Sequence, residues 1–402
     1  MRVLWVKPGG FLPLDSGGKI RSYHTVTNLA RHWPTTVITF YPAEKEDQNP
    51  TLQGLVDKLI TIPLSRNARA SIYGSAVVRS RPFMFEKFCR PHVLRAVSAE
   101  LHRIRYDVVI CDFVLACGVV PADVNATKIV FTHNVESRIW ERHYKVANNF
   151  ARRLVAKREW RTLAALEHKH LTEADAVLTV SEADRAEFVS WGISSEKVIS
   201  VPTGVDTSFF APRPLNSPTD TVVFTGSMDW MPNQDGILYF LNEIYPAIKK
   251  KHPSVKLQVV GRRPPPKIRE ECARHADVSV TGWVDDIRDY LAKADLCVVP
   301  LRVGSGTRLK IFEAMAMGKA IISTTIGAEG LPVTDQKDII IADSPSDFAD
   351  RTLELLQDRV KRETLGTEAR TLVERHYSWE AVTAEFMNTI SAVRAKFARN
   401  PS

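Results

Sequence analysis

The feature that most constrains the fold is a rhythm of short apolar runs separated by helix-like stretches, which recurs along the 402 residues of the chain. The runs are almost continuously hydrophobic and rich in β-branched residues, a pattern typical of parallel strands covered by helices on both faces. The first half of the chain therefore predicts a doubly wound α/β domain. Its expected strands are 2–7, 35–40, 58–62, 107–111, 128–132, 176–180 and 198–201.

The rhythm breaks at residues 201–220, a segment rich in Pro, Thr and Ser that has the composition of a linker. It then restarts, and a chain of this length is long enough for two such domains. We expect an N-terminal Rossmann-like domain at 1–205 and a C-terminal Rossmann-like domain at 206–378. The strands expected in the second domain are 221–225, 256–260, 278–281, 296–299, 320–323 and 338–341.

The last segment, residues 379–402, predicts an amphipathic helix. Its apolar side chains recur at intervals of three and four residues, which places them on one face of the helix. Such a helix either covers one domain or crosses back to join the two, and we expect it to pack on the N-terminal domain. The residues of the apolar face are Trp379, Val382, Phe386, Ile390, Val393 and Phe397.

Composition narrows the kind of partner without selecting one. The chain carries 54 Lys and Arg against 46 Asp and Glu, a formal net charge of +8, which favours anionic partners such as phosphates, acidic lipids or nucleic acids. Its five cysteines include no C-x-x-C pair, so we expect reduced thiols and no structural metal site. No signal peptide and no apolar run of bilayer length is recognisable, which predicts a cytoplasmic protein, at most peripheral at the inner face of the membrane.

One stretch, VGSGTRLKIFEAMAMG at residues 303–318, has the pattern of an anion site. Gly304 and Gly306 lack a Cβ atom, so backbone amides of this loop and of the following helix N-terminus can approach a ligand closely. Arg308 and Lys310 add full positive charges, and Glu313 could accept hydrogen bonds from ribose hydroxyls. The pattern predicts a diphosphate site. The alternative is a tight turn before a core helix that carries an incidental Lys310–Glu313 ion pair.

Two further loops of the second domain could reach the same ligand, because ligands of open parallel sheets bind at the carboxyl ends of the strands. Gly226 and Ser227 follow the first strand of this domain, where ordinary loop and capping chemistry is the alternative. Trp283 and the backbone of Val284 follow the third strand and could contact a nucleotide base. The alternative for Trp283 is packing at a domain edge.

The first domain offers two candidate positions of its own. Gly17 and Gly18 provide open backbone near a helix start, although this loop is not a G-x-G-x-x-G fingerprint of an ordinary dinucleotide fold. His133 stands just past the end of the strand at 128–132, where a catalytic or sugar-contacting side chain belongs. A purely structural histidine is the alternative.

Basic side chains concentrate in the first domain, in the stretches 66–105 and 138–169. Solvated helix faces are the usual reason for such charge. A surface that faces anionic lipid head groups is a second interpretation. Nucleic-acid binding is not expected, because no recognition module or interleaved aromatic platform accompanies the charge.

Taken together, these residues resemble the GT-B nucleotide-sugar glycosyltransferases. The similarity is greatest to the retaining "group 1" (family 4-like) transferases, in the branch with G-S-G-T-R-L-K that includes sugar transferases of exopolysaccharide clusters. It extends over nearly the whole chain and is strongest at 224–330 and in THNVES, VSEADRAEF and VPTGVD. The resemblance implies two Rossmann-like domains that face across a cleft, an NDP-sugar donor on the second domain, an acceptor on the first, and a C-terminal helix that crosses back.

The resemblance also implies roles for particular residues. Glu313 matches the second carboxylate of the family's E-x7-E motif and would bind the ribose, whereas Ser305 occupies the position of the first carboxylate. Ser227 follows Gly226 where the family has a basic pair, so Arg308 and Lys310 would replace that charge. The remaining donor-site candidates are Thr307 in the loop, Gly17 and Gly18 near the diphosphate, and His133 beside the donor sugar.

The function expected from this resemblance is hexose transfer from an NDP-sugar to a glycan or lipid-linked acceptor with retention of configuration. Cations at the departing diphosphate would stabilise its developing charge, so no metal or other cofactor is expected. The alternatives are an NDP-sugar epimerase on a GT-B scaffold and a non-catalytic nucleotide-sugar-binding protein. The base (UDP, GDP or ADP), the sugar and the acceptor stay open at this point.

Overall fold

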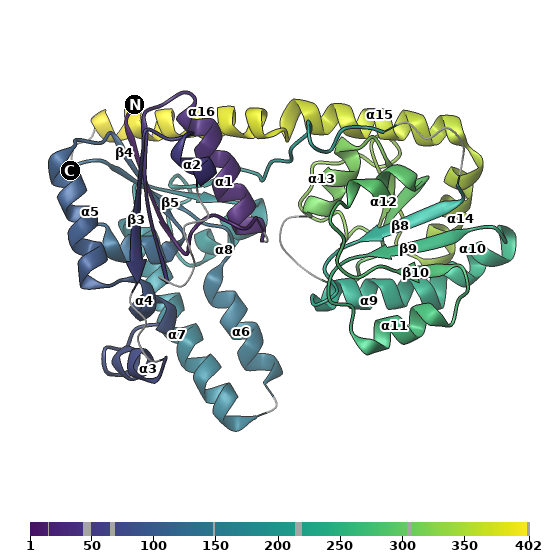
Figure 1. Cartoon of the computed structure of the whole chain (residues 1–402), viewed down its shortest axis with the longest axis horizontal. Helices are drawn as coiled ribbons and strands as arrows, with labels where there is room; N and C mark the ends of the chain where they lie inside the picture. The colour runs from purple at the N-terminus through teal and green to yellow at the C-terminus, as the bar shows by residue number, and fades with distance from the viewer. Residues whose placement is uncertain are drawn as a thin grey trace. The chain divides into compact units, whose positions relative to one another are not determined.

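The computed structural model of the chain describes residues 1–14, 16–42, 50–64, 69–147, 149–213, 219–303 and 308–399. It divides into two compact units (Figure 1). Unit 1 comprises Met1–Pro202 together with Val382–Ser402, and unit 2 comprises Thr203–Ala381. Each unit is a parallel sheet with helices on its faces, so the predicted doubly wound α/β architecture is confirmed.

The described part of unit 1 forms a seven-stranded parallel sheet with the order β3-β2-β1-β4-β5-β6-β7. The order reverses between β1 and β4, which creates the crevice where ligands of such sheets bind. Val3 of β1 is aligned with Thr35 of β2 on one side and with Val108 of β4 on the other. The strands are β1 Val3–Pro8, β2 Thr35–Pro42, β3 Lys58–Leu64, β4 Val108–Asp112, β5 Thr127–Phe131, β6 Ala176–Thr179 and β7 Val198–Ser200.

Helices cover both faces of this sheet. The hydrophobic core of unit 1 accordingly consists of two separate clusters of buried side chains. Two of the helices, α6 and α7, lie side by side and extend beyond the sheet (Figure 1). The helices are α1 Gly17–Ala30, α2 Pro50–Gln53, α3 Arg69–Val78, α4 Phe83–Phe88, α5 Pro91–Arg103, the 3-10 helix η1 Val114–Val119, α6 Glu136–Val146, α7 Phe150–Glu173 and α8 Glu182–Ser190.

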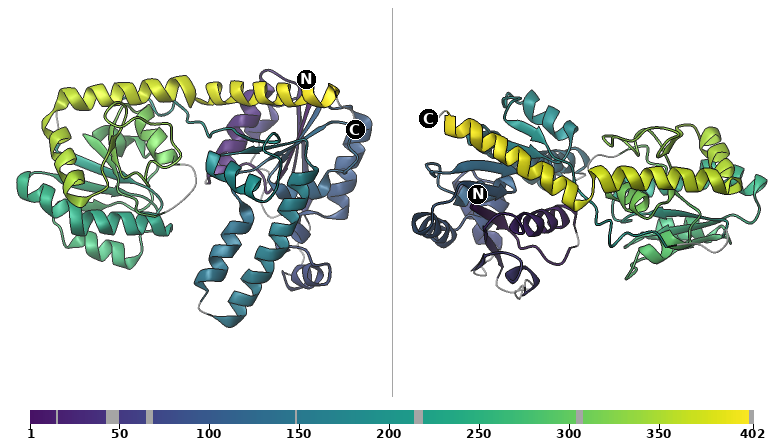
Figure 2. Two further views of the ribbon diagram at one scale, coloured as in Figure 1. Left: turned by 180° about the vertical axis from the view of Figure 1, so that it is seen from behind. Right: turned by 90° about the horizontal axis from the view of Figure 1, so that it is seen from above.

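The C-terminal helix α16, Trp379–Arg399, contributes to the core of unit 1. Its Phe386 ring lies 5.3 Å from the ring of Phe131 and 6.1 Å from that of Trp5. Val382 and Ile390 join the same cluster, which also holds residues of α1, so both helices cover one face of the sheet (Figure 2). The apolar spacing of this helix thus places its side chains in a buried core.

The described part of unit 2 forms a six-stranded parallel sheet with the order β10-β9-β8-β11-β12-β13, which reverses between β8 and β11. Its strands are β8 Thr221–Thr225, β9 Lys256–Val260, β10 Val278–Val280, β11 Leu296–Val299, β12 Ala320–Ser323 and β13 Ile340–Ile341. The helices are α9 Met231–Tyr239, the π-helical turn η2 Phe240–Ile244, α10 Tyr245–Lys251, α11 Pro266–Ala273, α12 Arg288–Lys293, α13 Leu309–Ala316, α14 Pro345–Gln357 and α15 Arg359–His376.

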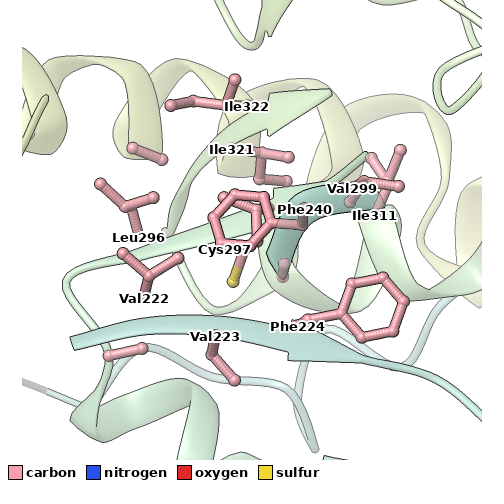
Figure 3. Close-up of a cluster of buried hydrophobic side chains, with 14 of the residues drawn as sticks. Val222, Val223, Phe224, Phe240, Leu296, Cys297, Val299, Ile311, Ile321 and Ile322 are labelled. Carbon is pink, nitrogen blue, oxygen red and sulfur yellow. The ribbon is translucent and has the colours of Figure 1, made fainter. Parts of the chain in front are cut away.

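The core of unit 2 explains why its strands have continuous apolar sequences. Phe240, Cys297 and Ile322 are buried in one cluster around β8, β11 and β12 (Figure 3). All five cysteines of the chain are free thiols. The last strand is shorter than expected and begins at Ile340, because residues 336–338 form a turn. In this turn Asp338 accepts a hydrogen bond from the Thr334 amide at 2.8 Å.

The predicted linker at 201–220 is not a uniform connector. Residues 203–213 belong to unit 2, where Val205 forms a parallel bridge with Ser378. The ring of Trp379 packs so closely on Gly204 that a Cβ atom there would lie 2.6 Å from it. Residues 214–218 lie outside the described ranges.

Candidate functional site

The edge of the unit 2 sheet at the ends of β8 and β11 brings Gly226 and Lys310 together. The Lys310 ammonium donates a hydrogen bond to Asn233 Oδ1 at 2.6 Å and lies 4.5 Å from the centre of the Phe224 ring. A Cβ atom at Gly226 would lie 2.6 Å from both Lys310 Nζ and Asn233 Nδ2. Only glycine leaves room for this arrangement, so Gly226 has a steric role beside the lysine.

Arg308 lies at the N-terminal end of α13, on the same edge of the sheet. Its side chain is buried, donates a hydrogen bond to the Ile326 carbonyl at 3.2 Å, and lies 5.8 Å from the Trp230 ring. Burial lowers the pKa of Arg308 from its ordinary value. A buried guanidinium at a helix start is a strong contributor to an anion site, because both the charge and the helix amides favour negative ligands.

Lys310 and Glu313 are partly buried and both titrate near neutrality. Burial lowers the pKa of Lys310 to about 7, and the charge of Arg308 acts in the same direction. Burial raises the pKa of Glu313 to about 7 against the attraction of Lys310. Among the described residues no ion pair within 4 Å joins these two side chains, so the incidental ion pair is not supported as the reason for their spacing.

Two cations of this edge were missed by sequence reasoning: Arg262 and Arg263, which follow β9. Arg262 Nε donates to Ser227 Oγ at 2.8 Å, and Ser227 donates to Asp229 Oδ1 at 2.6 Å. Arg263 pairs with Asp229 at 3.3 Å. The run GRRPPP directly after the expected strand 256–260 is the signal that could have revealed them.

Trp283 and Val284 follow β10 and have different environments. The Trp283 side chain is 70 % exposed, so packing within unit 2 is not its role and its ring is available to a planar ligand group. Val284 packs against the core of unit 2.

The glycine-rich loop itself falls outside the described ranges. The predictions for Gly304, Ser305, Gly306 and Thr307 concern these residues and stay predictions.

In unit 1, His133 follows β5 and is held by a buried polar cluster. Its Nε2 atom lies 2.6 Å from Asp112 Oδ1 and 3.3 Å from Ser22 Oγ. Asp112 Oδ2 accepts a hydrogen bond from Trp5 Nε1 at 2.9 Å and lies 3.6 Å from Lys7 Nζ. The carboxylate therefore fixes the imidazole from one side.

The protonation of this cluster follows from burial and charge. Burial lowers the pKa of His133 to about 4, although Asp112 opposes the shift. Burial disfavours the Asp112 carboxylate, yet Lys7 and His133 hold its pKa at about 2. At neutral pH the imidazole is neutral, and its Nε2–H is assigned as the donor to Asp112. His133 Nδ1 is then a buried acceptor without a partner among the described residues.

Gly18 brings the first turn of α1 against this cluster. A Cβ atom at Gly18 would lie 2.9 Å from the Phe113 ring and 3.5 Å from His133 Cγ. Gly17 is exposed at the start of the helix. The neighbouring Arg21 is buried and donates to the carbonyls of Thr132 and Val201, both at 2.6 Å, so its charge has a structural role.

No helix in the described part of the chain is both long and apolar enough to span a bilayer. In the same part of the chain, no group of three or more His, Cys, Asp and Glu side chains is arranged to hold a metal ion.

Comparison with known proteins assigns a class to each half of the chain. Residues 17–209 match the family model "Glycosyltransferase Family 4", and residues 219–358 match "Glycosyl transferases group 1". Among solved structures, HepE of Anabaena in complex with UDP and glucose has a TM-score of 0.66 at 15% identity, covering 97% of this chain and 99% of that one. Sucrose-phosphate synthase of Thermosynechococcus elongatus has a TM-score of 0.68 at 20% identity, covering 99% and 100%. These likenesses show the GT-B fold.

Curated relatives point to the same group. A phosphatidyl-myo-inositol mannosyltransferase of Mycolicibacterium smegmatis is 28% identical over 204 residues, covering 48% of this chain and 52% of the relative. A GDP-mannose-dependent alpha-(1-6)-phosphatidylinositol monomannoside mannosyltransferase of Mycobacterium tuberculosis is 27% identical over 235 residues, covering 52% and 60%. The matches thus span little more than half the length of these relatives. With the GT-B fold and the two matched regions, the chain belongs to the superfamily of GT-B glycosyltransferases.

Proposed function

We propose that this protein is a retaining hexosyltransferase that moves a sugar from an NDP-sugar to a glycan or lipid-linked acceptor in bacterial polysaccharide or glycoconjugate synthesis. The observation that carries the proposal is the meeting of Gly226, Arg308 and Lys310 at the carboxyl edge of the unit 2 sheet. This edge combines full positive charge with a helix N-terminus, and a diphosphate is the substrate group that such a site suits best.

The proposed chemistry depends on the leaving group. A nucleoside diphosphate gains negative charge as the glycosidic bond breaks, and cations already in place stabilise that charge without reorganisation. Lys310 is well suited to this role, because its pKa of about 7 rises when an anion binds and the side chain then carries a full charge. Arg308 and Lys310 supply the charge that a metal ion would otherwise provide.

The other candidates take supporting roles in this proposal. Glu313, on α13, is the acceptor for the ribose hydroxyls, and the exposed ring of Trp283 is the contact for the base. His133 is the contact for the transferred sugar, since its unpartnered Nδ1 can accept a hydrogen bond from a hydroxyl. No carboxylate nucleophile is assigned, so we favour front-face attack assisted by the leaving phosphate.

The relatives suggest which substrates to test first. HepE was solved with UDP and glucose, and the Mycobacterium tuberculosis relative is named for GDP-mannose and a phosphatidylinositol monomannoside. UDP- and GDP-sugars are therefore the first donors to compare, and lipid-linked acceptors come before free glycans.

We further propose peripheral contact with an anionic membrane through the tip where α6 and α7 meet. Phe150 is 83 % exposed and Leu154 59 % exposed, and both stand among the exposed cations Arg152 and Arg153. Exposed apolar side chains within a basic surface suit the boundary between lipid head groups and acyl chains. Localisation at the inner face of the membrane accords with this contact.

The experiment that tests the proposed function is a donor screen. Thermal shift with UDP-, GDP- and ADP-sugars identifies the base, because ligand stabilisation increases with affinity. Release of the nucleoside diphosphate from the stabilising donor then tests turnover. Stabilisation without any release, with or without acceptor, would favour the non-catalytic binding protein.

A further inference from the structure

A pocket of about 170 Å³ lies in unit 1 beside the His133 cluster. It is bounded by the first turns of α6, the middle of α7 and the segment that leads into α4. Phe113 joins the two places, since it lines the pocket while its ring centre lies 4.3 Å from that of His133. The apolar part of the lining includes Met84, Phe113, Leu115, Ile139, Trp140 and Leu163.

The polar part of the lining consists of Asn134, Glu136 and Glu159, and these residues differ in the hydrogen bonds that they already make. Asn134 lies between His133 and α6 and is exposed, with no side-chain hydrogen bond among the described residues. Glu136 begins α6, and its carboxyl group accepts a hydrogen bond from the Val114 backbone amide. Glu159 is already engaged, because its carboxylate accepts hydrogen bonds from the Phe83 amide at 2.8 Å and from Arg158.

The loop that carries these polar groups is held in place from behind. The Glu167 carboxylate accepts hydrogen bonds from the backbone amides of Glu136 and Ser137, at 2.7 and 3.0 Å, and so caps the N-terminus of α6. Burial and the charge of Glu167 raise the pKa of Glu136 to about 8. Glu136 is therefore mostly a neutral carboxyl group at pH 7 and can donate as well as accept a hydrogen bond.

The volume limits the part of a ligand that the pocket can enclose to a single ring. Complete drug-sized ligands occupy pockets of roughly 300–1,000 Å³, whereas a cavity of about 150 Å³ suffices for one six-membered ring. A nucleotide or a disaccharide is too large to be enclosed by the pocket of about 170 Å³.

The lining then selects the chemistry of the ring. A purely apolar occupant would take the Asn134 amide and the remaining hydrogen-bonding capacity of the Glu136 carboxyl group out of water without giving them partners, which costs free energy. No Lys or Arg is among the described residues that line the pocket, so an anionic occupant such as a phosphate or a uronate would lose its hydration without gaining a cationic partner. A pyranose avoids both penalties, because its C–H face can contact Phe113 and Trp140 while its hydroxyl groups bond to the polar edge.

From these observations we infer that the pocket binds one neutral monosaccharide ring and excludes acidic sugars. The binding itself does not depend on the proposed transferase activity, but the assignment of this ring as the acceptor sugar does. A ring bound beside Phe113 would lie next to His133, which suits a sugar that presents a hydroxyl group for transfer.

The test is ligand-observed NMR of the full chain with methyl glucoside, methyl galactoside, methyl mannoside, methyl glucuronide and 1-hexanol. We expect at least one neutral glycoside to bind and the glucuronide and hexanol not to bind. Ile139→Trp places a bulky side chain at the rim, where Ile139 is 44 % exposed and the change is tolerable, and should abolish binding. The matched control is Ala165→Trp on the exposed face of α7, which should bind as the wild type does.

A second pair of variants separates hydrogen bonding from folding. Glu136→Gln keeps a neutral donor and acceptor and should bind within about threefold of the wild type, whereas Glu136→Leu should bind roughly tenfold more weakly. Equal binding by the wild type and Ile139→Trp, failure of every neutral glycoside to bind, or preferential binding of hexanol would overturn the inference. Release of nucleoside diphosphate from donor is measured separately, so glycoside binding without turnover would refute the proposed function and leave the pocket assignment standing.

Discussion

Lys310 is the residue on which the proposed donor chemistry depends most. Its side chain contacts Phe224 and Asn233 in the free protein, and burial there lowers its pKa to about 7. A bound diphosphate would raise this pKa, so that Lys310 carries a full positive charge. The residue is therefore suited to stabilise the negative charge that develops on a leaving group.

Replacing Lys310 with Ala should reduce the rate of sugar transfer at least ~100-fold, by analogy with the loss of one preorganised donor to a developing oxyanion. The control is Lys250→Ala, an exposed lysine of α10 that should leave the rate unchanged. Steady-state kinetics with the preferred donor provide the measurement. Similar rates for the two variants would remove Lys310 from the mechanism.

The pKa of Lys310 also predicts a pH dependence of ligand binding. Because this pKa is lowered to about 7, the free protein holds the Lys310 proton below that pH and loses it above. Affinity for a nucleoside diphosphate should therefore fall as the pH rises above 7, by roughly tenfold per pH unit at the steepest. Calorimetry of the wild type and of Lys310→Met gives the comparison, and an equal slope in both proteins would show that another group controls binding.

Gly226 supports the same site through the space that it leaves empty. Gly226→Ala should displace Lys310 and Asn233, lower the Tm and weaken nucleoside diphosphate binding, because the new Cβ atom would overlap both side chains. Gly74→Ala is the matched control, since a Cβ atom there meets nothing within 4 Å and α3 gains helix propensity. Equal melting temperatures for the two variants would contradict the steric argument.

At the scale of elements, α6 and α7 contact each other extensively and combine two proposed roles. Their shared base holds the single-ring pocket, and their tip holds the exposed apolar and basic residues. A lipid-linked acceptor has both a sugar and a membrane anchor, so one hairpin could engage both parts of it.

The membrane contact is tested at the tip of the hairpin. Phe150→Asp combined with Leu154→Asp should reduce co-sedimentation with vesicles that contain phosphatidylglycerol several-fold, because it removes apolar area and adds negative charge. Val360→Asp with Ile326→Asp, two exposed apolar positions in unit 2, is the control. Equal sedimentation of the two double variants would move the contact elsewhere.

The C-terminal helix shows how local pattern becomes tertiary structure. Phe386 and Ile390 recur at helical spacing, and the structure places them in the same core as Trp5 and Phe131 of the sheet. The spacing predicted an apolar face from sequence. The partners of that face became visible only in the structure, because they are distant in the chain.

At the scale of the whole molecule, the sequence predicted the architecture well. Buried parallel strands can be recognised in a sequence by their continuous apolar runs. The runs 221–225 and 296–299, for example, coincide with β8 and β11 over their full lengths. The order of the strands in each sheet could not be predicted, since no local sequence pattern encodes which strands are neighbours.

The sites were predicted less completely than the fold. Gly226 and Lys310 were each predicted from a local motif, but their contact through Asn233 links residues far apart in sequence. The pairing of His133 with Asp112 and the engagement of Arg262 with Ser227 are also tertiary contacts. The bonds from the buried Arg21 side chain to the Thr132 and Val201 carbonyls are likewise contacts that no local pattern predicts.

The proposed function as a whole depends on a diphosphate site at the end of β8 and the start of α13. A crystal structure of the protein with the nucleoside diphosphate of its preferred donor tests this most directly. We predict density for the two phosphates beside Lys310 and Arg308, with the backbone of Gly226 in contact. An ordered nucleotide bound elsewhere, with that edge of the unit 2 sheet empty, would contradict the account.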